Sequence, residues 1–186
     1  MDNAIDEVLP AAGHAVADRR PRRLELWLPI LIVAVDQATK AMVKASLPLQ
    51  ESVTIIPGML DITHVLNSGA AFGILNGVDF PFKTVAIAMI AMAALVGVGM
   101  YAASISHHQL IARVGLALII GGAAGNLIDR VLAGSVVDFV DVYWRTHHFW
   151  AFNVADSAIS VGVAIMILDM LGLDRASRNS DVPTSI

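Results

Sequence analysis

Long apolar stretches separated by shorter, more polar segments make up most of the chain. Residues 84–105 form the clearest stretch, 22 residues without a charged side chain, which matches the roughly 20 residues that a membrane-spanning helix needs. Residues 24–46, 110–131 and 153–172 are also long enough, but they contain ionisable side chains. Because three such stretches accompany one definite span, the pattern predicts an all-α polytopic membrane protein with four transmembrane helices.

The two longer segments between these stretches have their own patterns. Residues 47–83 alternate apolar and polar side chains and contain the turn pair Pro57-Gly58, which predicts short strands and turns. A small extended, β-rich platform is therefore expected there. Residues 132–152 hold more than half of the Trp, Tyr and Phe residues, a composition typical of the membrane interface.

Composition agrees with a membrane protein and narrows the chemistry. The chain is 56% hydrophobic and 15% charged, against roughly 25% charged residues in soluble domains. A net charge of -4 gives no basic surface for nucleic acid, so nucleic acid is not an expected partner. The absence of cysteine excludes disulfides, a thiolate nucleophile and Cys-ligated metal centres.

The positions of Lys and Arg predict the orientation in the membrane. Four spans place both termini on one side, and seven of the 12 Lys and Arg residues fall on that side, against three on the other. The positive-inside rule therefore predicts cytoplasmic termini, with residues 47–83 and 132–152 outside. Residues 24–172 then form one membrane domain, and residues 1–23 and 173–186 are expected to be poorly ordered cytoplasmic tails.

Two aspartates stand out because both lie among apolar residues at the predicted outer boundary. Asp138 precedes the fourth span, and Asp156 follows the good N-cap residue Asn153 by three positions. Capping explains Asp156 but not Asp138. Two converging carboxyl groups can share a proton, so that one acts as base and the other as acid in adding water across a peptide bond. A small proton-coupled transporter and a non-enzymatic assembly subunit are the alternatives.

The other ionisable residues in the spans have structural interpretations. Asp36 and Lys40 are spaced i to i+4 and can pair on one helix face. Gly122 and Asn126 belong to a face whose small residues allow close helix contact, with Asn126 able to form a hydrogen bond across it. Neither a His-x-x-x-His metal face nor a G-x-S-x-G nucleophile motif is present, so no metal or cofactor is expected.

Five motifs in order resemble the bacterial lipoprotein signal peptidase family, also called signal peptidase II. The resemblance covers roughly residues 25 to 172. The motifs are "DQATK" at 36–40, "NSGAAFGIL" at 67–75, "GGAAGNLIDR" at 121–130, "VVDFVD" at 136–141 and "FNVADSAI" at 152–159.

The resemblance implies an aspartyl endopeptidase of the bacterial cytoplasmic (inner) membrane. Such an enzyme removes the signal peptide of a prolipoprotein just before a cysteine that carries diacylglycerol, within membrane lipid, and is inhibited by globomycin. Asp138 and Asp156 are implied to be the catalytic dyad, and a monomer is expected. The implied supporting and substrate-binding residues are Asp36, Lys40, Asn67, Gly69, Ala70, Phe72, Gly122, Asn126, Asp129, Arg130, Asn153 and Ala155.

Overall fold

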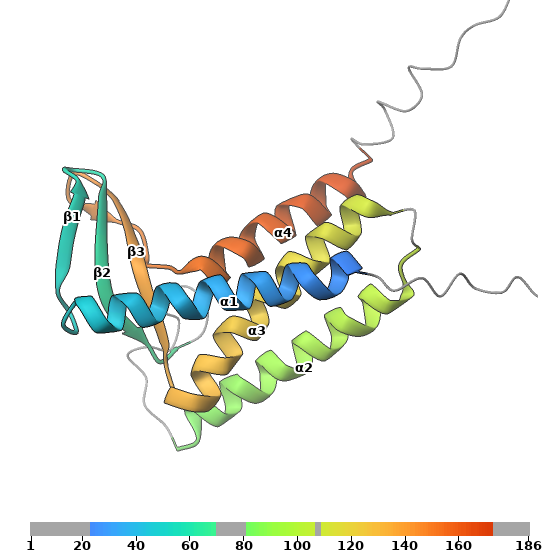
Figure 1. The fold of residues 1–186 in the computed structure, drawn as a ribbon, viewed down its shortest axis with the longest axis horizontal. Coiled ribbons are helices and arrows are strands. Elements are labelled where there is room, and N and C mark those ends of the chain that lie inside the picture. The colour runs from blue at the N-terminus through green and yellow to red at the C-terminus, as the bar shows by residue number, and fades with distance from the viewer. Residues whose placement is uncertain (1–22, 70–80, 107–108, 173–186) are drawn as a thin grey trace, which may run out of the picture.

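The computed structural model describes residues 23–69, 81–106 and 109–172 (Figure 1). These residues form four helices and four strands. In chain order the elements are α1 (Arg23–Ser46), β1 (Ser52–Ile56), β2 (Leu60–Asn67), α2 (Lys83–Ser104), α3 (Leu110–Ala133), β3 (Val136–Trp144), β4 (His147–His148) and α4 (Val154–Met170).

The strands form an antiparallel sheet, in the order β1-β2-β3-β4, at one end of the helices (Figure 1). The turn between β1 and β2 contains Gly58, whose φ of 80° favours glycine. The predicted β-rich platform is therefore confirmed. Strand β3 was not predicted, because the aromatic residues of that segment were interpreted as interfacial anchors, although its β-branched and aromatic side chains also favour a strand.

Three helices are long and apolar enough to cross a membrane, namely Leu26–Ser46 within α1, α2 and α3. The chain is therefore a membrane protein. Helix α2 carries an outward apolar surface, with Met89, Ile90 and Met100 each at least 65% exposed, as expected for side chains that face lipid. Helix α4 has 17 residues and is shorter than the other three, so the fourth span stays a prediction.

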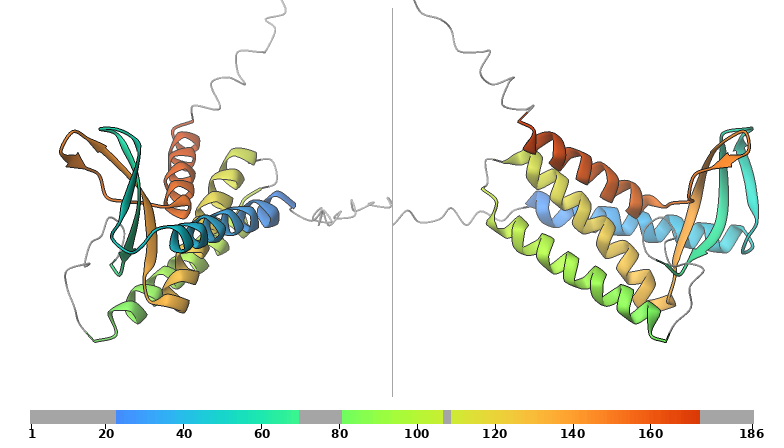
Figure 2. Two further views of the ribbon diagram at one scale, coloured as in Figure 1. Left: turned by 60° about the vertical axis from the view of Figure 1, so that its left-hand side comes forward. Right: turned by 180° about the vertical axis from the view of Figure 1, so that it is seen from behind.

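Helix α3 packs against both α1 and α4 through glycines. A Cβ added at Gly121 would lie 2.9 Å from Cα of Pro29 in α1, and one added at Gly162 of α4 would lie 2.6 Å from the Gly115 oxygen of α3. Figures 1 and 2 show α4 running beside α3, with α2 beyond α3. The small residues therefore let the three backbones approach closely, as the sequence predicted for Gly122.

The sheet is fixed to the helices by a small apolar cluster. Val43 from the last turns of α1 packs with Val137 and Phe139 of β3, and all three are buried. Asp138 lies between the two β3 members of this cluster. Its position relative to the helices is therefore set by packing on both sides of it along the strand.

Candidate active site

The first turn of α4 is held by a capping box. The Asn153 side chain accepts a hydrogen bond from the Asp156 backbone N–H at 2.9 Å, and Asp156 Oδ2 accepts one from the Asn153 backbone N–H at 3.3 Å. Asp36 of α1 caps the same turn, because its Oδ1 accepts the Ala155 backbone N–H at 3.0 Å. The predicted capping role of Asn153 is confirmed, and Asp156 is fixed at the N-terminus of α4.

Asp138 is bound by two asparagine amides. Asn153 Nδ2 donates to its Oδ1 at 2.7 Å, and Asn67 Nδ2 from the end of β2 donates to its Oδ2 at 3.0 Å. Asp138 is only 3% exposed and Asn153 is fully buried. Asn153 thus contacts both aspartates, Asp138 through its amide and Asp156 through the capping box. The structure brings together the two carboxyl groups that the sequence singled out.

Asn126 of α3 connects this pair to α1. Its Nδ2 donates to Asp156 Oδ1 at 2.7 Å, while its Oδ1 accepts from Lys40 Nζ at 3.0 Å and from Asn153 Nδ2 at 3.2 Å. The partners determine the orientation of the amide, because its oxygen faces two donors and its nitrogen faces a carboxylate. Asn126 is therefore held in one orientation from three sides.

Lys40, which donates to Asn126, also pairs with two acids. Its Nζ lies 2.8 Å from Asp36 Oδ2, as predicted from the i to i+4 spacing, and 2.8 Å from Asp129 Oδ2 of α3. All three side chains are at most 4% exposed. Such a buried cluster requires its partners, because an unpaired buried charge is costly.

Arg130 holds the end of β2 in place. Its Nη2 donates to the Gly69 carbonyl at 3.2 Å, and the Gly69 N–H donates to Asn67 Oδ1 at 3.0 Å. Since Asn67 in turn donates to Asp138, Arg130 supports that carboxyl group indirectly. Its Nη1 donates in the same way to the Asn126 carbonyl at 3.2 Å, which ties Arg130 to its own helix.

Two residues near the site, Gln37 and Lys83, were missed by the sequence interpretation. Gln37 Nε2 donates to Asp36 at 3.2 Å and also to Asp129 and the Gly125 carbonyl, and Lys83 Nζ donates to Ser68 Oγ at 3.3 Å. Gln37 could have been found from its place in the "DQATK" motif. Lys83 gave no comparable signal, because it stands alone at the start of an apolar stretch.

Two predicted site residues, Ala70 and Phe72, lie outside the described residues. The remaining predicted residues converge at one end of the bundle, where α3 ends and α4 begins. Gly122 is among them, because a Cβ at that position would overlap the Ala155 carbonyl oxygen, next to Asp156.

Comparison with known proteins shows the family to which the chain belongs. Residues 28–172 match the family model described as signal peptidase (SPase) II. The chain belongs to the signal peptidase II family. Every residue of the site described above falls inside the matched range.

Individual relatives agree with the signal peptidase II assignment. The lipoprotein signal peptidase of Geobacter metallireducens is 48% identical over 145 residues, which cover 77% of this chain and 87% of that protein. That of Geobacter sulfurreducens is 43% identical over 143 residues, covering 77% and 88%. A bacterial membrane enzyme solved by the in meso method at 2.3 Å resolution has a TM-score of 0.72 and 30% identity, covering 89% of this chain and 95% of its own.

Burial changes the acidity of Asp138 at this signal peptidase II site. Its pKa rises from 3.8 to about 6, first because burial disfavours the carboxylate and second because Asp156 is nearby. Hydrogen bonds from Asn67 and Asn153, and the charge of Lys40, oppose the rise. A carboxyl group with this pKa can hold or release a proton near neutral pH, which suits general acid or base chemistry.

Amide groups and the Lys40 ammonium group lie between the carboxyl groups of the site. Within residues 23–69, 81–106 and 109–172, no three His, Asp or Glu side chains are arranged as metal ligands. The arrangement instead offers two carboxyl groups on either side of one asparagine, where β3 meets the N-terminus of α4.

Proposed function

We propose that this protein is an aspartyl endopeptidase that removes the signal peptide from diacylglyceryl-modified prolipoproteins, with Asp138 and Asp156 as its catalytic pair. The observation that carries the proposal is the double contact of Asn153, which binds Asp138 at 2.7 Å and Asp156 through the capping box. Membership of the signal peptidase II family supports protease activity and lipoprotein processing.

The proposed reaction adds water across the scissile amide. One aspartate, ionised, takes a proton from water as the water oxygen bonds to the carbonyl carbon. The other aspartate carries a proton and gives it to the departing amide nitrogen as the C–N bond breaks. The products are a carboxylic acid and an amine, and the proton taken from water restores the pair. The raised pKa of Asp138 supports the sharing of one proton by the two groups.

The position of the site supports a lipidated substrate. Asp138 lies on β3 and Asp156 in the first turn of α4. Nearby in the chain, Trp144 at the end of β3 and Phe149 and Trp150 after β4 are between 62% and 66% exposed. Exposed aromatic rings favour the membrane interface. A substrate with its acyl chains in the bilayer would therefore present its scissile bond at the level of the pair. Gly69, at the end of β2, would allow the backbone there to approach the signal peptide.

We further propose that α4 is the fourth span. Its 17 residues measure about 25 Å, at the short end of what spans a bilayer. It also follows α3 closely, from Ala155 beside Gly122 to Gly162 beside Gly115. Four spans give cytoplasmic termini by the positive-inside rule and place the pair at the outer face of the inner membrane. The monomer would then bind globomycin-type inhibitors at this site.

The test is cleavage of a diacylglyceryl-modified prolipoprotein by the purified protein in detergent, followed by gel shift. Asp138→Asn and Asp156→Asn should each lower the rate at least about 100-fold, the usual contribution of general acid and base groups. Asp141→Asn, on the same strand, and Asp169→Asn, at the other end of α4, are matched controls and should cleave like wild type.

The possible outcomes test the proposed substrate and the proposed catalytic pair separately. A wild-type protein that leaves the lipidated substrate uncut, under conditions in which it is folded, overturns the proposed substrate. Wild-type rates in either Asp138→Asn or Asp156→Asn overturn the pairing while leaving the family assignment in place. Equal loss in the Asp141→Asn control would show that any carboxyl loss near the sheet impairs cleavage.

A further inference from the structure

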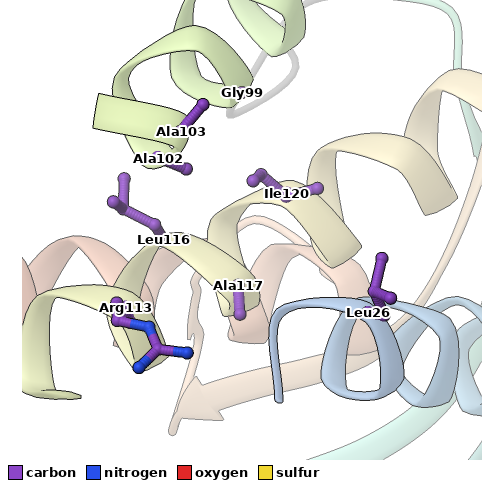
Figure 3. A pocket seen from close by; sticks show the side chains of 8 residues that line it. All are labelled: Leu26, Gly99, Ala102, Ala103, Arg113, Leu116, Ala117 and Ile120. Carbon is purple, nitrogen blue, oxygen red and sulfur yellow. The ribbon is translucent and has the colours of Figure 1, made fainter. Parts of the chain in front are cut away.

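A groove lies at the end of the bundle opposite to the aspartate pair. It has a volume of about 380 Å³ and is formed where α1 begins, α2 ends and α3 begins. Figure 3 shows Leu116 and Ile120 of α3 pointing toward α2, with Leu26 of α1 to one side. The small side chains of α2, including Gly99 and Ala102, form the facing wall.

The walls of this groove are apolar except at one place. Arg113, one turn into α3 and half-buried, is the only charged side chain among the residues that line it. Gly99 is open, since a Cβ added there would meet nothing within 4 Å. The groove lies on helices that are long and apolar enough to cross a membrane, so lipid is the medium expected around it. An unfilled apolar groove of this size would forfeit packing along all three helices.

We propose that this groove binds one acyl chain of an anionic phospholipid, whose phosphate pairs with Arg113. The apolar wall follows α3 for about two turns from Arg113 to Ile120, about 10 Å, and so matches a chain that descends from a headgroup. Its volume would hold about a dozen groups of water or methylene size. Arg113 supplies the planar donor that pairs well with phosphate.

The orientation in the membrane also favours a negative headgroup at this end. In the orientation proposed above this end faces the cytoplasmic leaflet, which is rich in anionic lipid. A signal peptide helix is the competing occupant, but its basic N-terminal region would be repelled by Arg113.

The experiment measures lipid binding to the full-length protein, purified in a neutral detergent, by native mass spectrometry and thermal unfolding. Phosphatidylglycerol should bind one molecule per protein and raise Tm, while phosphatidylcholine should bind about tenfold more weakly and inorganic phosphate should have no effect. Arg113→Gln should remove this preference. Lys44→Gln is the matched charge control, because Lys44 is exposed in the last turn of α1 at the other end of the bundle.

A second pair of variants tests the groove itself. Gly99→Leu should fill the groove and weaken phosphatidylglycerol binding about tenfold or more. Gly97→Leu, two residues away on the same helix and equally open, should bind like wild type. Equal binding of the two lipids, or unchanged binding in both Arg113→Gln and Gly99→Leu, overturns the proposal. Stabilisation by inorganic phosphate alone would point to a simple anion site and also overturn it.

A synthetic signal peptide supplies the last arm of the experiment. Displacement of phosphatidylglycerol by that peptide would assign the groove to substrate rather than to lipid, and would overturn the proposal. Because every readout is lipid binding or Tm, failure here leaves the aspartate mechanism untouched. Likewise, a cleavage assay that overturned the aspartate pair would not alter the expected lipid preference.

Discussion

Replacing Gly122 by alanine should show how closely the N-terminal end of α4, which carries Asp156, depends on its contact with α3. A Cβ at this position would overlap the Ala155 carbonyl oxygen and lie 2.8 Å from Ile159 Cγ1. The oxygen belongs to the backbone and cannot rotate away. Helix α4 must therefore shift at Ala155, the residue next to Asp156.

The magnitude of the destabilisation follows from overpacking. Inserting a methyl group into a well-packed contact costs about 1–3 kcal/mol. Alanine also favours a helix over glycine by up to about 1 kcal/mol, and the control must share that gain. Gly97→Ala on α2 does so, because its Cβ would meet nothing within 4 Å. The difference in free energy of unfolding between the two variants therefore measures the overlap alone. We expect Gly122→Ala to be about 1–3 kcal/mol less stable than Gly97→Ala.

The effect on activity should exceed the effect on folding. Restoring an ordinary contact of 3.4 Å or more displaces Ala155, and Asp156 with it, by up to about 1 Å. A misplacement of this size can reduce a catalytic rate about 100-fold. Gly162→Ala overlaps α3 in the same way, 2.6 Å from the Gly115 oxygen, but about two turns further from Asp156. It should lose similar stability and much less activity.

The assay combines unfolding in mixed micelles with cleavage of the lipidated prolipoprotein at a temperature where every variant is folded. Gly122→Ala should show a lower kcat than Gly162→Ala at matched stability. Gly97→Ala should cleave like wild type and be up to about 1 kcal/mol more stable than wild type. The reasoning would be refuted if Gly122→Ala were as stable as Gly97→Ala. It would also be refuted if Gly122→Ala and Gly162→Ala lost the same fraction of activity.

Three further predictions follow from the charges and the topology. The pKa of Asp138 is about 6 in the folded protein, against an ordinary value of 3.8, so the folded state becomes less stable as the carboxyl group ionises with rising pH. Wild type should therefore lose up to about 3 kcal/mol of stability between pH 4 and pH 7 relative to Asp138→Asn. Parallel pH profiles of the two proteins would contradict this prediction. Lys40→Met should lower the free energy of unfolding by about 3–5 kcal/mol, because it leaves two buried carboxylates without their cation. Lys44→Met, at an exposed position, should change it by less than about 0.5 kcal/mol. Equal losses in the two variants would contradict this prediction. The chain has no cysteine, so Arg145→Cys should react with a membrane-impermeant maleimide in intact spheroplasts and Ser180→Cys only after lysis. Reaction of both variants in intact spheroplasts would overturn the fourth span, and the reverse pattern would overturn the orientation.

The helices and their ends could be predicted from the sequence, because length and apolar content decide them. The predicted stretch 110–131 corresponds to α3, which ends at Ala133, where Gly134 adopts a φ of 76°. The Asn153 cap was predicted from residue type and position alone. These features depend on neighbours within one or two turns, which a single sequence displays directly.

The contacts between distant segments could not be predicted in the same way. The sequence placed Asp138 and Asp156 at one boundary, but it could not show that Asn153 contacts both. Strand β3 was missed, because aromatic residues favour both strands and membrane interfaces. The pairing of Val65 with Asp138 depends on a register between β2 and β3 that is set by residues about 70 positions apart.

The four carboxyl groups of the site differ in the partners that hold them. Asp36 and Asp129 lie against the ammonium group of Lys40, so each has a cation at 2.8 Å. Asp138 and Asp156 accept instead from neutral donors, the asparagine amides and one backbone N–H. A proton can therefore enter or leave the second pair without breaking an ion pair. In the proposed mechanism the first pair would fix the helices, and the second pair would exchange a proton with water and substrate.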